Sequence, residues 1–448
     1  MRDLLVATIV FGALPFVLRR PFLGILLMAW LGYMNPHRLC YGFILSFPVV
    51  QIVAIFTLLG MMMIREPKRM VWGVEIVLII VLVSMKGIST LLGFYPEAAQ
   101  NDLIRFVKIQ ILTFMTLMLL TSPQRVTLLI WAIVVSLGFY GLKGGLFTLA
   151  HGGVYRVEGP FGTFIGGNNE LALAMVMTIP LARYLYQQES SKLVRLGLLM
   201  LMCLLAIAAI GTQSRGALVA LSITGFVFWW KGKNKILSGI LIAAAAAFIL
   251  SFMPDSWFER MNTIKTYEQD ASAMGRINAW WVAFRVANEH MFGGGAGMWT
   301  PAIFQRHAPV PNDVHDVHSI YFEVLGEQGW PGLVVFVLLL VTTWFKCWSI
   351  QRMAKKHPDT TWARDLALMI QVSLVGYMSA GTFLGLAYFD YLYHLIAVVV
   401  VTHMLVKQAR REQQPSDAPK LDLFTSLRGL MARPQRRSST FGLPSPHR

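Results

Sequence analysis

The chain has 448 residues, of which 56% are hydrophobic and only 14% are charged. Soluble domains carry about 25% charged residues, so this composition, with a mean hydropathy of +0.57, excludes a soluble protein. The formal net charge of +16 comes with no nucleic-acid-binding module. We assign much of this excess positive charge to cytoplasmic loops and a basic tail, where it orients the helices and contacts anionic lipid.

Apolar segments of helix length recur along the whole chain. Residues 41–64 and 236–252 are longer than a membrane-spanning strand and lack its alternation of apolar and polar residues. Helices satisfy their own backbone hydrogen bonds in lipid, so the sequence predicts an all-α polytopic membrane protein. We expect helices over 3–18, 21–34, 43–64, 72–94, 103–121, 129–149, 169–186, 194–211, 215–230, 236–253, 319–350, 365–384 and 391–407. The first two are short and form either two spans or one broken element, so about 12 spans are expected.

The distribution of Lys and Arg orients these helices, because basic loops stay on the cytoplasmic side. The basic segments are 65–69, 231–235, 352–364 and the tail from Lys407. The alternating loops then lie outside, and they are 95–102, 150–168, 211–215 and 254–318.

Four regions follow from this pattern. Residues 1–253 are transmembrane helices joined by short loops, and 254–318 form one long outer loop. We expect the long loop to be folded and to carry active-site residues, because it contains aromatic residues and a helix-like stretch over 277–290. Residues 319–407 return to the membrane, and 408–448 form a basic, disordered cytoplasmic tail.

Arg215 is the residue that the charge pattern fits worst, because it falls in a short outer loop at the start of a span. It could be an interfacial arginine whose side chain reaches the headgroups. However, the positive end of the helix dipole disfavours a cation at this place. A helix N-terminus next to an arginine instead favours bound anions. Arg215 is therefore a candidate for binding an anionic substrate.

Two further outer features carry chemistry. The first is Gly275-Arg276 in the long loop. The second is the segment 313–318, which packs two acids together with His315 and His318. These side chains could ligate a metal, but no cysteine or third histidine lies at ligand spacing, so we expect no metal site. The alternative, which we favour, makes His318 a base that accepts a proton near neutral pH, with His315 in a supporting role.

Buried or interfacial charged residues form a second group of candidates. Lys86, Lys143 and Arg156 map to the outer half of the membrane. Each could simply reach the headgroups, but together they would make an outer cavity strongly positive and suited to phosphorylated lipids. Glu327 lies nine residues after His318. It approaches His318 only if the helix breaks near 326–331, so a structural or supporting role is expected.

The order and sidedness of these motifs resemble those of the O-antigen ligase family. The motifs are Ser214-Arg215-Gly216, Gly275-Arg276 in the long loop, and His318-Ser319 followed by Gly326-Glu327-Gln328-Gly329. The opening of the chain is also similar to O-glycosylation ligases associated with exosortase. Because of that second likeness, the acceptor of the glycan could be either a lipid or a protein.

The resemblance implies a glycosyltransferase of the membrane-embedded GT-C type in the bacterial inner membrane. Its donor would be O-antigen on undecaprenyl diphosphate, and its acceptor lipid A–core, on the periplasmic side. By this analogy Arg215 and Arg276 hold the diphosphate, and the basic residues of the outer half bind lipid phosphates. His318 would take the proton of the acceptor hydroxyl, and transfer would invert the anomeric centre without metal or cofactor. An O-antigen polymerase, a protein O-oligosaccharyltransferase and a transporter are the alternatives, although a transporter would be expected to show internal repeats.

Overall fold

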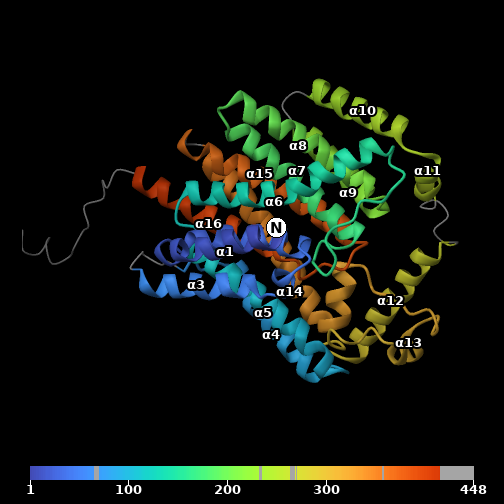
Figure 1. Cartoon of the computed structure of the whole chain (residues 1–448). Helices are drawn as coiled ribbons and strands as arrows, with labels where there is room; N and C mark the ends of the chain where they lie inside the picture. Colours follow the sequence, from blue (N-terminus) through green and yellow to red (C-terminus); the bar gives the residue numbers. More distant parts are fainter. Residues whose placement is uncertain (65–69, 232–234, 263–267, 269, 356–357, 414–448) are drawn as a thin grey trace, which may run out of the picture. The chain divides into compact units, whose positions relative to one another are not determined.

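Regular structure in the described part of the chain is entirely helical (Figure 1). This computed structural model describes residues 1–64, 70–231, 235–262, 268, 270–355 and 358–413. Two units are distinguished, Met1–Lys407 and Gln408–Arg448, and the fold described below is that of the first. The predicted disordered tail lies outside the described residues from position 414 onward.

The helices follow one another with short connections over most of the chain. In chain order they are α1 (Arg2–Arg19), α2 (Phe22–Tyr33), η1 (Pro36–Leu39), η2 (Phe43–Leu45), α3 (Val49–Met63), α4 (Val74–Leu92), α5 (Pro96–Leu119), α6 (Pro123–Ala150), α7 (Asn168–Gln188), α8 (Lys192–Gly211), α9 (Arg215–Lys231), α10 (Lys235–Phe252), α11 (Asp255–Asn262), α12 (Ala271–Glu289), α13 (Pro301–His307), α14 (Ile320–Ala354), η4 (Pro358–Thr360), α15 (Thr361–Gly381) and α16 (Asp390–Gln413).

Every segment predicted as a helix contains one, which confirms the all-α class of this multi-pass membrane protein. The predicted outer loop 95–102 is wrong, because α5 already begins at Pro96. Proline is favoured in the first helical turn, and Glu97 in the same turn complements the helix dipole. Five helices in the described residues are long and apolar enough to cross a membrane, namely α4, α6, α8, α14 and α16. The total of about 12 spans stays a prediction.

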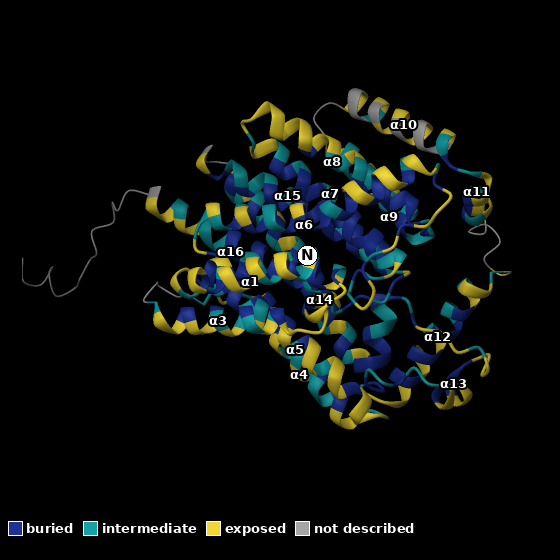
Figure 2. Ribbon diagram, viewed as in Figure 1, coloured by how far each residue is buried: buried dark blue, intermediate teal, exposed yellow. Residues whose placement is uncertain are grey.

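The centre of the first unit is built on α7 and α16. Residues 391–401 of α16 are buried without interruption, as expected for a helix that is apolar on all sides. α15 packs against α7, α9 and α14, while α6 packs against α8. Figure 2 shows buried residues concentrated where α6, α7 and α15 meet. Helices surrounded by other helices in this way need not be apolar enough to face lipid.

α14 is broken near its start, and the break fixes the position of Glu327. Gly329 has φ 68° and ψ −171°, a conformation that glycine adopts readily because it has no Cβ. Pro331 has no N–H, so it cannot donate to the Glu327 carbonyl as a continuing helix would. That carbonyl accepts instead from the Gly295 N–H at 3.1 Å and from the Ser89 hydroxyl. The start of α14 is therefore held against the end of α4.

The long segment 254–318 contains three helices, α11, α12 and α13. α12 and α13 lie side by side (Figure 1) and share a small apolar core with the chain that joins them. Its buried members are Ala279, Val282, Val286, Met298, Ile303, Phe304 and Ala308. α12 extends the helix-like stretch 277–290 by six residues toward the N-terminus. It also packs against α14, so the segment is tied to the transmembrane helices.

Candidate active site

A small pocket forms where the N-terminal ends of three helices converge, and it is called the arginine pocket below. Residues at the starts of α7, α9 and α12 all line it. The Ser214 hydroxyl caps α9 by accepting from the Ala217 N–H at 3.2 Å. Each helix start carries partial positive charge, so their convergence favours an anion. The lining residues are Asn169, Ser214, Arg215, Gly216, Ala217, Arg260, Ser272, Arg276, Ala380, Phe383 and Leu384.

Three arginines add full positive charges to this pocket. Arg215 and Arg276 were predicted from the sequence, and Arg260 of α11 is the third. Burial and the charge of Arg215 lower the pKa of Arg276. Burial, followed by the charges of Arg156 and Arg215, lowers the pKa of Arg260. Since like charges disfavour one another's ionised forms, a bound anion would stabilise the cluster. The Arg276 Nε is a buried donor with no hydrogen-bond partner among the described residues.

Asp270 connects two of the converging helices. Its carboxylate forms an ion pair with Arg215 at the start of α9. The same carboxylate accepts from the Ala273 N–H at 3.1 Å and so caps α12. Sequence reasoning missed both Asp270 and Arg260. An acidic residue directly before a helical stretch is a recognisable cap, so Asp270 carried a usable signal, whereas nothing in the sequence marked Arg260.

His318 lies in a constrained segment directly before α14. Its φ is 40°, a left-handed conformation that is unusual for a residue with a Cβ and that clusters at functional sites. Trp280 holds the preceding residue, because its indole N–H donates to the Val317 carbonyl at 2.8 Å. The Trp280 ring also stacks on Phe322, with centroids 4.9 Å apart. α12 therefore fixes His318 and carries Arg276.

Burial lowers the pKa of His318 from its ordinary value of 6.5. Asp316 opposes this shift, with its Oδ2 3.8 Å from the His318 Nδ1, while the charge of Arg276 lowers the pKa further. The neutral imidazole is thus favoured at pH 7, which is the form that can accept a proton.

His318 lies beside the wall between the arginine pocket and a second cavity. Asn169 and Leu384 line the pocket, while their chain neighbours Glu170 and Gly385 line the cavity. His318 lines neither, but a Cβ placed on Gly385 would be 3.8 Å from the His318 Cα. The structure therefore brings Arg215, Arg276 and His318 to one region, although they are far apart in the sequence.

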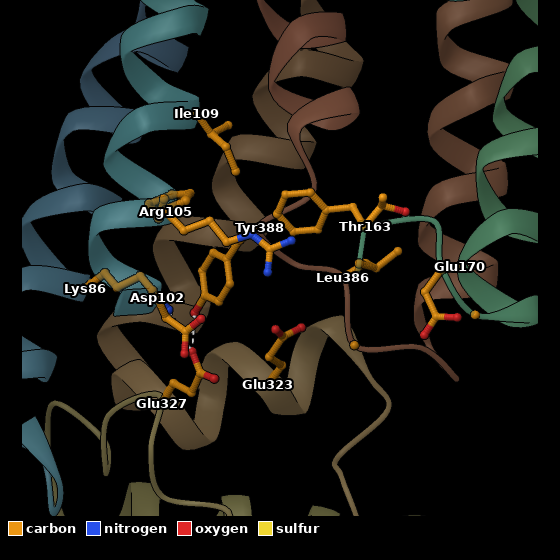
Figure 3. A pocket seen from close by; sticks show the side chains of 14 residues that line it. Lys86, Asp102, Arg105, Ile109, Thr163, Glu170, Glu323, Glu327, Leu386 and Tyr388 are labelled. Atoms are coloured by element: carbon orange, nitrogen blue, oxygen red, sulfur yellow. Dashed lines mark hydrogen bonds and ion pairs between the residues drawn. The ribbon is translucent and has the colours of Figure 1, made fainter. Parts of the chain in front are cut away.

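The second cavity, called the acidic cavity below, has a volume of about 300 Å³ (Figure 3). Residues of four helices and two loops surround it, and most of their charged side chains are acidic. The lining residues are Lys86, Asp102, Arg105, Phe106, Ile109, Thr163, Phe164, Gly167, Glu170, Glu323, Glu327, Gly385, Leu386 and Tyr388.

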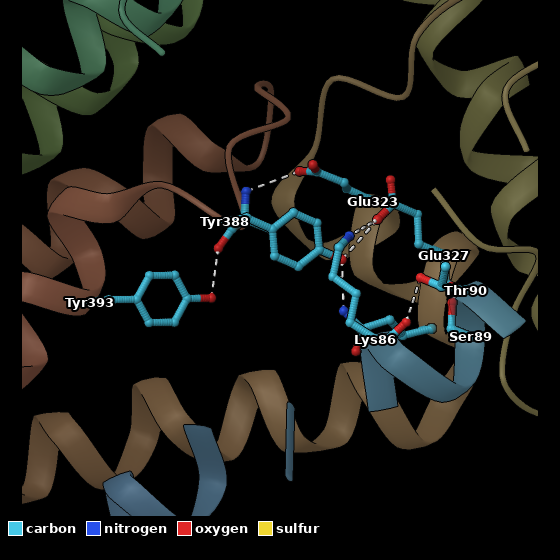
Figure 4. A network of polar contacts seen from close by, with 9 residues as sticks. Lys86, Ser89, Thr90, Glu323, Glu327, Tyr388 and Tyr393 are labelled. Atoms are coloured by element: carbon cyan, nitrogen blue, oxygen red, sulfur yellow. Dashed lines mark hydrogen bonds and ion pairs between the residues drawn. The ribbon is translucent and has the colours of Figure 1, made fainter. Parts of the chain in front are cut away.

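Lys86 is engaged within the protein (Figure 4). Its Nζ lies 2.9 Å from the Glu327 Oε2, and the two side chains are only 2% and 7% exposed. The Tyr388 hydroxyl donates to the same carboxylate oxygen at 2.9 Å, and the Lys86 Nζ lies 3.6 Å from the centre of the Tyr388 ring. Lys86 therefore reaches the cavity wall as one half of an ion pair with Glu327.

We expect Lys86→Met to destabilise the protein, because it leaves the Glu327 carboxylate buried without its cation. Breaking a buried pair in this way costs about 3–5 kcal/mol. Adding Glu327→Gln removes the remaining charge and should restore most of the loss. Thermal unfolding of purified protein, followed by tryptophan fluorescence, checks both variants. A single variant as stable as the parent would contradict this role of the pair.

The remaining predicted residues lie farther from the two spaces. Lys143 and Arg156 are exposed and line neither of them, although Arg156 is close enough to affect Arg260. His315 is exposed, and its Nε2 lies 2.7 Å from the Asp313 Oδ1. Its ring covers Gly275, where an added Cβ would meet it at 2.1 Å. In the part of the chain that the structure describes, no three His, Cys, Asp or Glu side chains are arranged to hold a metal ion.

Comparisons with known families bear on both halves of the chain. Residues 1–190 match a family of unknown function, DUF5935. Residues 199–337 match the family described as O-antigen ligase, and this range includes the three pocket arginines and His318. No curated protein matches the chain at a significant level. Residues 199–337 therefore form a domain of the O-antigen ligase family.

Proposed function

We propose that the protein transfers O-antigen from undecaprenyl diphosphate to lipid A–core on the periplasmic side of the bacterial inner membrane. The observation that carries the proposal is the arginine pocket, in which three arginines and three helix N-termini surround one space. Donors of this kind stabilise negative charge where it develops on a leaving group. A lipid diphosphate is such a leaving group.

The diphosphate would bind across the mouth of the arginine pocket. The pocket is small, about 40 Å³, so the diphosphate would exchange with the Asp270 carboxylate on Arg215. The unpartnered Nε of Arg276 offers a further donor. A guanidinium can contact two phosphate oxygens at once, so Arg215 and Arg276 would bind the donor and also stabilise the departing diphosphate.

His318 would act on the acceptor hydroxyl. As the acceptor oxygen forms a bond to the anomeric carbon, the bond from that carbon to the diphosphate oxygen breaks. The hydroxyl proton passes to the neutral imidazole, and the bonding pair leaves with undecaprenyl diphosphate. Attack from the face opposite the diphosphate inverts the anomeric centre. Arg276 favours the neutral, proton-accepting form of His318.

The decisive experiment combines the purified full-length protein with lipid-linked O-antigen and lipid A–core. A joined product on lipid A–core supports the proposal. A product that forms only by lengthening the lipid-linked glycan would instead indicate a polymerase. Transfer only to a protein acceptor would indicate an O-oligosaccharyltransferase.

Transfer is expected to proceed without a divalent metal, because the arginines would supply the positive charge at the diphosphate. We expect the initial rate to be unchanged by excess chelator or by added Mg²⁺, Mn²⁺ or Ca²⁺. The measurement compares rates of product formation under these conditions. Loss of rate in chelator that one metal restores would argue for carboxylate and imidazole ligands near 313–318.

A further inference from the structure

The acidic cavity has the opposite electrostatic character to the arginine pocket. Its lining includes two cationic side chains, Lys86 and Arg105, and four acidic ones, Asp102, Glu170, Glu323 and Glu327, for a formal charge of −2. The lining of the arginine pocket carries three arginines and no acid, and the Asp270 carboxylate neutralises one of them. A diphosphate is thus drawn to the pocket and repelled by the cavity.

Part of the cavity's polar lining is already paired within the protein. Lys86, Glu327 and Tyr388 satisfy one another. The Arg105 guanidinium lies over the Phe164 ring, 3.6 Å from its centre. These contacts line part of the cavity with aromatic rings and neutralised charges.

Glu323 lies beside this network and is available for a ligand. One of its carboxylate oxygens, Oε2, accepts from the Ala387 N–H at 3.0 Å, and Figure 3 shows the carboxylate rising from α14 into the cavity. Its other oxygen, Oε1, keeps acceptor capacity in either protonation state of the carboxyl group, so Glu323 can accept a further hydrogen bond. Asp102 and Glu170 add acceptors along the rim.

Several acceptors facing aromatic rings fit a hydroxyl-rich, uncharged ligand. Hydroxyl groups donate to carboxylates, while the apolar faces of a sugar ring pack against aromatic side chains. The volume of about 300 Å³ lies at the lower end of the about 300–1,000 Å³ of small-molecule sites. One or two sugar residues are therefore a suitable occupant.

We propose that the acidic cavity binds the sugar of the acceptor, with Glu323 accepting a hydrogen bond from one of its hydroxyl groups. This inference rests on the proposed function, and it assigns the acceptor to the side opposite the diphosphate. Inverting transfer needs that arrangement, because the acceptor oxygen attacks the face away from the leaving group. His318 lies beside the wall between the two spaces, where the attacking hydroxyl would have to pass.

Direct binding to the purified full-length protein tests the assignment without requiring turnover. The two probes are inorganic pyrophosphate and the dephosphorylated core oligosaccharide released from lipid A. Glu323→Gln is expected to weaken oligosaccharide binding about 10-fold, the effect of one hydrogen bond, and to leave pyrophosphate binding unchanged. Arg276→Ala should do the reverse. Glu97→Gln, which alters an exposed carboxylate on the same helix as Asp102, is the matched control and should affect neither.

Glu323→Gln keeps an oxygen that can accept from the Ala387 N–H, so it is expected to fold, and its unfolding temperature verifies this. Oligosaccharide binding equal to that of the parent, or lost equally in Glu97→Gln, would overturn the assignment. If transfer occurs but the KM for lipid A–core is the same in Glu323→Gln, the inference fails and the proposed function stands. If lipid A–core accepts no glycan but the oligosaccharide binds through Glu323, the sugar site stands and the proposed acceptor fails.

Discussion

Arg215→Ala is expected to reduce glycan transfer at least about 100-fold, because removing one preorganised donor from a developing negative charge costs about 10²–10³ in kcat. Arg215 opens α9 inside the arginine pocket, where both the helix dipole and the guanidinium face the proposed diphosphate. Transfer from lipid-linked O-antigen to lipid A–core, quantified from the joined product, measures the loss. Arg215→Lys keeps the charge but should also be impaired, since an ammonium cannot make the two-point planar contact.

The loss of catalysis in Arg215→Ala must be distinguished from a folding defect, because Arg215 also pairs with Asp270. Asp270→Asn keeps a good helix cap and removes the carboxylate that competes with the donor, so it should retain transfer better than Arg215→Ala does. Arg306→Ala, which changes an exposed arginine in the long segment 254–318, is the control and should be fully active. Wild-type levels of product from Arg215→Ala would refute the diphosphate role.

Hydropathy was sufficient to locate the long apolar helices, because each apolar segment must form one wherever it meets lipid, but it did not mark the short helices α11 and α13. Arg215 could also be identified from the sequence, since its place at the start of a span conflicts with the usual distribution of charge. The start of α5 was missed because the polar residues 95–102 resemble a loop, whereas a first-turn proline and glutamate suit a helix end.

The partners of the charged residues depend on tertiary structure and could not be predicted. Lys86 was expected to face phosphorylated lipids, but it pairs with Glu327, which lies 241 residues away in the sequence. The convergence of α7, α9 and α12 likewise arises only in the folded chain. Glu323, which the prediction did not single out, could have been found from the sequence, because it lies four residues before Glu327 on the same helical face. Ionisable residues in a membrane helix suggest a functional site.

His318→Ala is expected to lower the rate of transfer about 10²–10⁴-fold, the usual contribution of a general base, while the KM for the donor stays near that of the parent. The pH dependence gives the sharper test. A base must be neutral to accept a proton, so the parent rate should rise with pH and level off once the imidazole is deprotonated. Because burial lowers the pKa of His318 below 6.5, the rise should be centred below that pH.

Two variants on the same segment separate this role from a structural one. Asp316→Asn removes the carboxylate that raises the pKa of His318, so the pH profile should move to lower pH while the plateau rate changes little. His315→Ala alters a neighbouring imidazole that lies over Gly275, so its loss of rate should be mild and the profile should keep its histidine-dependent rise. His318→Ala should lose that rise altogether. A His318→Ala enzyme that still shows the parental profile, or that fails only because it no longer binds the lipid-linked donor, would show that another group accepts the proton.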